Sequence, residues 1–147
     1  MHEVTEACTR WPILCICYKM KNLTKEPEVL IIDDDEGLCI LLKAYLKRTF
    51  DVHIEHTLTE ANEYLLTHEC RLLFLDNGLP DGKGVEFITT IRSRNEHTQV
   101  VFMTGDVSAT IKDRALQAGA VHFIAKPFKL SQVGEIVHFL FPDLSAA

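Results

Sequence analysis

The chain has 147 residues, of which 47% are hydrophobic and 24% are charged, and its formal net charge at pH 7 is -6. These values are typical of a globular protein, and the length favours one domain that buries a core without disulfides or a metal. The acidic balance and the lack of a basic tract argue against broad affinity for nucleic-acid phosphates, and no apolar run is long enough to span a membrane.

The five cysteines form an odd set without a CxxC pair, and no histidine lies at zinc-ligand spacing to them. They are interpreted as reduced thiols, which indicates a cytoplasmic protein. The apolar run at residues 11–18 follows Glu3 and Glu6 rather than a basic region, so a secretory signal is not predicted. Residues 1–27 are either an arm that docks on this chain or a partner, or an over-long N-terminus with its working start near Met20.

From residue 28 onward, short apolar strands alternate with helical segments. The expected strands are 29–32, 51–55, 72–76, 99–103 and 121–125. The expected helices are 36–48, 59–68, 85–92, 108–118 and 131–140. Strict alternation with short connections predicts right-handed crossovers and a parallel sheet with helices on both faces, an α/β fold. We expect a domain at 28–142, with 1–27 as an N-terminal extension and 143–147 as a tail.

The helix expected at residues 36–48 has more apolar residues than one core-facing stripe needs. Either one face meets the sheet and part of another face stays exposed, or the helix is fully buried. The strand that follows alternates in polarity and is typical of a half-exposed edge strand. His53 and His56, in and after that strand, are interpreted as solvated side chains rather than ligands.

Four of the five expected strands end in residues that suit phosphate chemistry: Asp33-Asp34, Asp76, Thr104 and Lys126. In a parallel sheet the carboxyl ends share one edge, where ligands bind in open α/β folds, so these groups are expected to converge. Carboxylates packed together repel one another unless a cation is present. Mg²⁺ fits, because it takes hard oxygen ligands and uses few protein carboxylates.

In such a site Asp76 can act as a nucleophile, since a carboxylate can accept a phosphoryl group as an acyl phosphate. Lys126 would neutralise charge on the transferring oxygens, and Thr104 would hydrogen-bond one of them. Each residue also has an ordinary structural explanation, as a solvated turn, a helix cap or a surface charge. Their coincidence on one sheet edge favours a functional site.

These residues resemble the receiver domain of two-component response regulators over residues 28–142, and the length resembles that of its stand-alone, single-domain members. The matching residues are Asp33-Asp34, Asp76 with Pro80 and Gly84, Thr104, and Lys126-Pro127. The set, in order and in strand-end context, is highly specific. The resemblance implies a flavodoxin-like (βα)5 three-layer sandwich whose parallel five-stranded sheet has the order 2-1-3-4-5.

The resemblance also implies the role of each site residue. Asp76 is the expected phosphoacceptor, and Mg²⁺ is expected on Asp33 or Asp34, on Asp76 and on the backbone carbonyl of Gly78. The family's Lys-Pro bond is cis, which proline makes accessible. Thr104 and Phe123 are the expected switch pair, although Phe123 has no hydroxyl to bond a loop carbonyl.

Other positions take their interpretation from the same family. Gly78 and Asp106 occupy positions that tune phosphoryl lifetime, and Asp81 and Lys83 are interpreted as turn residues beside the site. The signalling surface would be formed by residues 108–118, 121–125 and 131–140. In phosphorelay members the first helix meets the phosphodonor, which would explain surplus apolar residues there, namely Leu38, Leu41 and Tyr45.

The predicted function is therefore a response regulator receiver, not an enzyme with a separate substrate. A sensor histidine kinase or a histidine phosphotransfer protein would supply the phosphoryl group, and a downstream protein would read the change. Nucleic acid and membrane are not expected partners, and a homodimer is left open. The alternative is a receiver-like binding module that works without phosphorylation.

A phosphatase of the haloacid dehalogenase type would also use a strand-end aspartate and Mg²⁺. Its nucleophile motif needs a second aspartate two residues on, where this chain has Gly78, and no cap insertion is evident.

Overall fold

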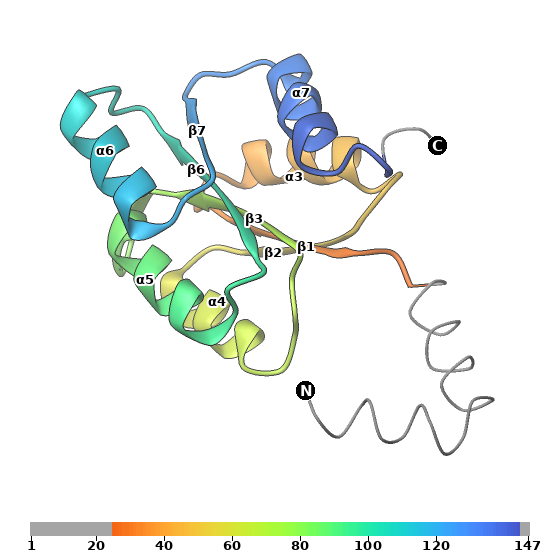
Figure 1. Cartoon of the computed structure of the whole chain (residues 1–147), viewed down its shortest axis with the longest axis horizontal. Helices are drawn as coiled ribbons and strands as arrows, with labels where there is room; N and C mark the ends of the chain where they lie inside the picture. The colour runs from red at the N-terminus through yellow and green to blue at the C-terminus, as the bar shows by residue number, and fades with distance from the viewer. Residues whose placement is uncertain (1–24, 145–147) are drawn as a thin grey trace.

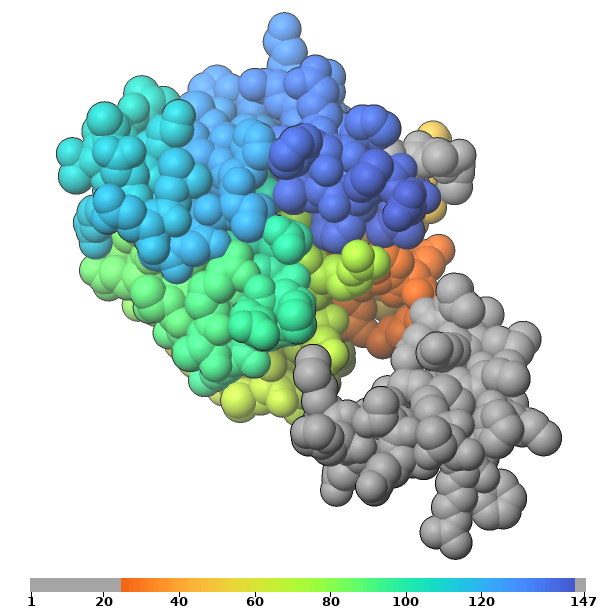
Figure 2. All heavy atoms as spheres, viewed as in Figure 1, coloured from red at the N-terminus to blue at the C-terminus, as the bar shows by residue number. Residues whose placement is uncertain are grey.

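The computed structural model describes residues 25–144, which form one parallel five-stranded sheet with helices on both faces (Figure 1). The sheet strands are β1 (Glu28–Ile32), β2 (Asp51–Glu55), β3 (Leu72–Asp76), β6 (Gln99–Thr104) and β7 (His122–Ala125). Their order is β2-β1-β3-β6-β7, so the predicted order 2-1-3-4-5 is confirmed. Space-filling shows these elements packed into one continuous body (Figure 2).

The helices that connect the strands cover the two faces unequally. They are α3 (Glu36–Leu46), α4 (Leu58–Leu65), α5 (Gly84–Arg94), α6 (Ala109–Ala118) and α7 (Leu130–Leu140). Buried residues of α3 and α7 join one hydrophobic cluster, and those of α4, α5 and α6 join the other. The result is the three-layer α/β sandwich that the alternating pattern predicted.

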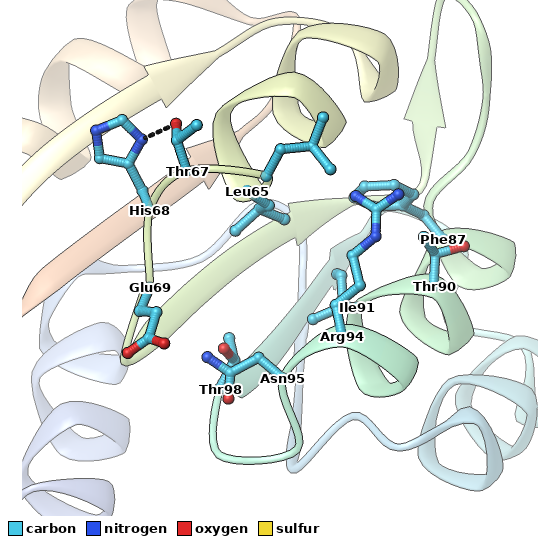
Figure 3. Close-up of a pocket in the computed structure, with 11 residues that line it drawn as sticks. Leu65, Thr67, His68, Glu69, Phe87, Thr90, Ile91, Arg94, Asn95 and Thr98 are labelled. Atoms are coloured by element: carbon cyan, nitrogen blue, oxygen red, sulfur yellow. Dashed lines mark hydrogen bonds between the residues drawn. The ribbon is translucent and has the colours of Figure 1, made fainter. Parts of the chain in front are cut away.

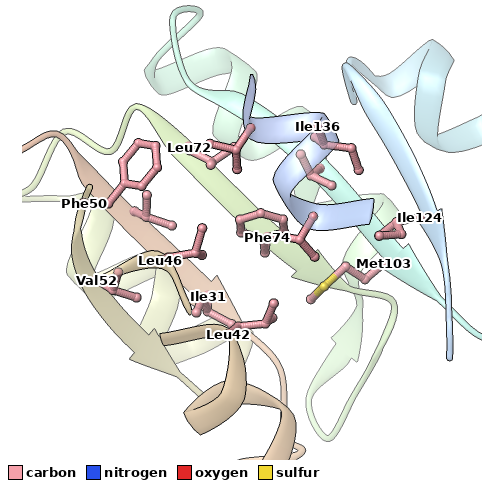
Figure 4. Packing of buried hydrophobic residues seen from close by; sticks show 14 of the residues in the cluster. Ile31, Leu42, Leu46, Phe50, Val52, Leu72, Phe74, Met103, Ile124 and Ile136 are labelled. Carbon is pink, nitrogen blue, oxygen red and sulfur yellow. The ribbon is translucent and has the colours of Figure 1, made fainter. Parts of the chain in front are cut away.

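Burial on both faces explains why the central strands are continuous apolar runs. On β1, Val29 and Ile31 point into the cluster under α3 and α7, whereas Leu30 and Ile32 point into the cluster under α4, α5 and α6. Phe74 on β3 lies in the first of these clusters, between the sheet and α7 (Figure 4). Successive side chains of a strand point to opposite faces, so a strand covered on both faces needs apolar residues throughout.

The helix α3 settles the choice between partial and full burial. It buries Cys39, Leu42 and Leu46 against the sheet. On its outer side Leu41 is 50% exposed and Tyr45 is 41% exposed. The apolar surplus of this helix therefore lies at the surface, as the first interpretation predicted.

One element was not expected from the sequence. Within the loop after Asp76, β4 (Gly78–Leu79) pairs with β5 (Gly82–Lys83) as a short antiparallel hairpin. Two residues per strand, flanked by glycine and proline, show no periodicity that a sequence pattern could reveal. The hairpin makes this loop a defined structure.

The expected arm at residues 1–27 lies almost wholly outside the described residues. Within residues 25–144, no helix is long and apolar enough to cross a membrane. The two cysteines in this range, Cys39 and Cys70, are free thiols and buried.

The buried position of Phe74 generates a stability prediction. Phe74→Ala should lower the free energy of unfolding by about 3–5 kcal/mol, because the fully buried ring leaves a cavity when it is removed. Phe139→Ala, at a residue that is 75% exposed, is the matched control and should change it by less than about 0.5 kcal/mol. Urea unfolding measures both, and equal losses would contradict this account of the core.

Candidate functional site

The three consecutive aspartates after β1 have three different positions. Asp33 is fully buried, and its Oδ1 accepts a hydrogen bond from the backbone N–H of Asp35 at 3.0 Å. Asp34 is exposed. Asp35 is the N-cap of α3 and accepts from the backbone N–H of Leu38 at 3.0 Å. The triplet is thus more than a solvated turn, because one carboxylate is held inside the fold.

Asp76 ends the central strand of the sheet, between β1 and β6. Only 7% of the residue is exposed. Its Oδ2 accepts from the backbone N–H of Gly78 at 3.1 Å, and its Oδ1 lies 3.0 Å from the Lys126 ammonium. The strand order therefore places Asp76 beside the ends of the two neighbouring strands.

Lys126 joins the two buried carboxylates. Its Nζ lies 2.5 Å from Asp33 Oδ2 and 3.0 Å from Asp76 Oδ1, and its peptide bond to Pro127 is cis, as predicted. Burial alone would lower the pKa of Lys126, but its hydrogen bonds to both carboxylates outweigh burial and raise that pKa. The ammonium group therefore stays charged at neutral pH.

One cation does not fully compensate the acidic groups. Burial raises the pKa of Asp33, and the hydrogen bond from Lys126 offsets only part of that effect, while the Asp76 carboxylate adds to it. Ligand oxygens of Asp33, Asp34 and Asp76 all lie within 4.8 Å of one another. Three hard oxygen donors at this spacing could hold a divalent cation such as Mg²⁺. The donor set fits the metal that the sequence predicted.

Of the predicted switch residues, Thr104 is the last residue of β6 and Phe123 lies on β7. Thr104 is buried, and its Oγ1 accepts from the backbone N–H of Asp106 at 3.1 Å. Phe123 is half-buried, and its ring centroid lies 6.2 Å from that of Phe102. The Lys112 ammonium lies over the Phe123 ring, 6.0 Å from its centroid. Thr104 thus belongs to the edge where the carboxylates meet, and Phe123 packs on the side of α6.

Gly84 fixes the geometry of the loop after Asp76. A Cβ at Gly84 would lie 2.1 Å from the carbonyl oxygen of Asp76, so no other residue fits there without backbone movement. The backbone N–H of Gly84 donates to the carbonyl of Asn77 at 3.0 Å, and the Asn77 side chain accepts from Val85 N–H. Glycine at this position is therefore a requirement of close backbone approach.

Two residues near the site were missed by sequence reasoning. His56, expected to be solvated, donates from Nδ1 to the carbonyl oxygen of Asp33 at 2.8 Å, because a carbonyl can only accept. Asp81, expected to be an ordinary turn residue, accepts from the backbone N–H groups of Leu58 and Thr59. The sequence offered one indication for His56: it directly follows an expected strand, so it lies at the sheet edge where the strand-end carboxylates meet.

One surface groove lies away from these residues. It measures about 430 Å³ and lies between the C-terminal ends of α4 and α5 (Figure 3). Its lining includes Leu65, Phe87 and Arg94. None of the predicted site residues lines this groove, which opens at the edge where the parallel strands begin. The chemistry of the strand ends, and not cavity size, identifies the candidate site.

Comparisons with known proteins agree with this geometry. A family model for the response regulator receiver domain matches residues 29–138. The response regulator protein PilR of Pseudomonas aeruginosa is 33% identical over 111 residues, which are 75% of this chain and 25% of that protein. The transcriptional regulatory protein SrrA of Staphylococcus aureus is 31% identical over 107 residues, which are 72% of this chain and 44% of that protein.

Among solved structures, a two-component response regulator from Clostridium difficile matches with a TM-score of 0.76 at 25% identity, covering 80% of this chain and 97% of that chain. The chain therefore belongs to the response regulator receiver domain family of two-component signalling. This confirms the predicted resemblance and leaves the phosphatase interpretation without support. The chain spans less than half the length of both curated relatives described above.

The raised pKa of Asp33 predicts how the stability of the metal-free protein changes when this carboxylate is replaced by an amide. A raised pKa means that the ionised carboxylate is less favourable in the folded chain than in the unfolded chain, so it opposes folding at neutral pH. Asp33→Asn should therefore raise the thermal midpoint in EDTA.

The same variant should lose the stabilisation that Mg²⁺ gives to the unaltered chain, because a cation ligand is missing. Differential scanning calorimetry with EDTA and with Mg²⁺ measures both effects. Asp113→Asn, at an exposed residue of α6, is the matched control and should show neither. A lower midpoint of Asp33→Asn in EDTA would show that the ion pair with Lys126 outweighs the burial of the charge.

Proposed function

We propose that this chain is a phosphoacceptor that takes a phosphoryl group from a phosphohistidine onto Asp76. The observation that carries the proposal is the contact of one lysine with two strand-end carboxylates, Lys126 with Asp33 and Asp76. Acidic groups held this close favour a site that binds a cation and an anionic group together. Membership of the receiver family supports the same reaction.

In this proposal Asp33, Asp34 and Asp76 hold Mg²⁺ through their carboxylates, together with the backbone carbonyl of Gly78. When bound, the ion supplies positive charge next to the transferring phosphoryl oxygens. The exposed position of Asp34 and the buried position of Asp33 suit a ligand set that faces both the fold and the solvent. Gly78 is held in the hairpin directly after Asp76.

The transfer itself requires one bond to form and one to break. A carboxylate oxygen of Asp76 attacks phosphorus, the bond from phosphorus to the imidazole nitrogen breaks, and the donor histidine leaves with its electron pair. Lys126 stabilises charge on the phosphoryl oxygens, and the Thr104 hydroxyl donates a hydrogen bond to one of them. The Thr104 oxygen already accepts from Asp106 N–H, which leaves its hydrogen free to point toward the phosphoryl group. Attack of water later releases phosphate and restores the carboxylate.

The chain catalyses only its own phosphorylation and dephosphorylation in this proposal. A sensor histidine kinase or a histidine phosphotransfer protein is the donor, and the exposed Leu41 and Tyr45 of α3 are suited to meet it. Thr104 and Phe123 carry the change to the surface formed by α6, β7 and α7, which a downstream protein or a second copy reads. A protein rather than nucleic acid as the partner agrees with the acidic charge. A cytoplasmic location agrees with the free thiols of Cys39 and Cys70.

Intact mass spectrometry tests the proposal directly. After incubation with acetyl phosphate and Mg²⁺, the chain should gain the mass of one phosphoryl group while acetate leaves. EDTA should abolish the gain, and so should Asp76→Asn, because the amide is not a nucleophile for phosphorus. Asp113→Asn, the same substitution on an exposed helix, should be phosphorylated like the unaltered chain.

No mass gain in any of these samples, together with no binding of beryllofluoride, would reject the phosphoacceptor. That result would favour the binding module that works without phosphorylation. A gain that persists in Asp76→Asn would place the acceptor at another residue.

A further inference from the structure

The segment from His56 to Thr59, which leads into α4, contacts both loops that carry the proposed metal ligands. On one side, Nδ1 of His56 donates to the carbonyl oxygen of Asp33 at 2.8 Å. On the other side, the Asp81 carboxylate accepts from the backbone N–H of Leu58 at 2.9 Å and of Thr59 at 2.8 Å. It also accepts from the Thr59 hydroxyl at 2.7 Å. Asp33 follows β1 and Asp81 lies in the hairpin after Asp76, so one helix end joins two loops.

We propose that Asp81 and His56 are positioning residues of the metal site, which hold its two ligand loops against the start of α4. The inference rests on the proposed function, because it concerns the Mg²⁺ ligands named there. Neither residue is a ligand itself. Their effect is to fix the backbone from which the ligands project, which is how outer partners of a metal site act.

The bonds to Asp81 are more than the helix cap that α4 needs. The helix has its own N-cap in Thr57, whose side chain accepts from the backbone N–H of Glu60. The Glu60 carboxylate in turn accepts from the backbone N–H of His56 at 3.3 Å. The hydrogen bonds from the N–H groups of Leu58 and Thr59 to Asp81 are exposed to solvent, so water could satisfy these donors without Asp81. A carboxylate from a distant loop therefore adds a tertiary link to a helix start that is already capped.

The hairpin that carries Gly78 is consequently held at both ends. At its base, Gly78 N–H donates to the Asp76 carboxylate and Gly84 N–H donates to the Asn77 carbonyl. At its tip, Asp81 follows Pro80 in the turn between the two short strands and bonds to α4. Because a two-stranded hairpin of this length is not stable alone, the tip contact limits how the Gly78 carbonyl can turn.

The contact of His56 acts on the other loop in the same way. The carbonyl of Asp33 accepts from His56 and also from the Cys39 thiol at 3.3 Å. That carbonyl belongs to the peptide between Asp33 and Asp34, so its orientation sets the direction from which both carboxylates project. An asparagine at position 56 would keep an N–H donor at the same number of bonds from the backbone, whereas alanine would remove it.

Metal binding and the start of α4 should therefore be coupled in both directions, because linkage between two equilibria is reciprocal. In the unaltered chain, Mg²⁺ should slow hydrogen exchange of the Leu58 and Thr59 amides. Asp81→Ala should abolish this protection, since the connection is lost. A role of Asp81 in helix stability alone would not make exchange at α4 depend on the metal.

The test compares Mg²⁺ affinity by isothermal titration calorimetry in the full chain and its variants at high ionic strength, where screening reduces the effect of the lost Asp81 charge. Asp81→Ala should bind Mg²⁺ about tenfold more weakly, a typical loss for an outer partner of a metal site. His56→Ala should also bind more weakly, and His56→Asn should restore the affinity. Thr57→Ala is the matched control, because it removes the local cap of α4 and leaves both loop contacts in place.

Thr57→Ala and Asp81→Ala should both lower the thermal midpoint, but only Asp81→Ala should change the Mg²⁺ dissociation constant. Equal dissociation constants in these two variants, or unaltered Mg²⁺ protection of α4 in Asp81→Ala, would overturn the inference. Failure of the unaltered chain to bind Mg²⁺ would instead reject the metal site of the proposed function. The two failures are therefore distinguishable.

Discussion

The site depends on the electrostatic balance between buried carboxylates and one lysine. Asp33 and Asp76 are held within the fold, where charge is costly, and Lys126 contacts both. One lysine faces the three carboxylates of Asp33, Asp34 and Asp76, so negative charge stays in excess, and burial raises the pKa of Asp33. A site with uncompensated negative charge gains more from a divalent cation than a neutral one would, so this balance links the fold to the proposed chemistry.

The sheet makes this balance possible. Asp33 and Lys126 are 93 residues apart in sequence, and their contact exists because β1, β3, β6 and β7 run parallel and end at one edge. Apolar side chains on both faces of β1 and β3 hold the strands rigidly in register. The hydrophobic core thereby supplies the rigidity that holds charges of like sign close together.

The loops around the site are more constrained than their sequences indicate. Close approach of backbone at Gly84 fixes the chain after Asp76, and hydrogen bonds from His56 and from the N-terminus of α4 reach the loops that follow β1 and β3. The first turn of α4 is thus connected to the carboxylates by the same contacts that shape the hairpin. This arrangement gives a helix on one face of the sheet a physical connection to events at the sheet edge.

The sequence by itself determined the alternation of strands and helices, the sheet order by resemblance, and Asp33, Asp34, Asp76, Thr104 and Lys126 as strand-end residues. These follow from local patterns, since periodicity and turn residues mark where each strand ends. The domain boundaries at residues 28 and 142 and the roles of the site residues stay predictions. Only the tertiary structure decided that Asp35 caps α3 while Asp33 is buried, that residues 78–83 form a hairpin, and that His56 and Asp81 bond across loops. Such contacts join residues distant in sequence, and no local pattern records them.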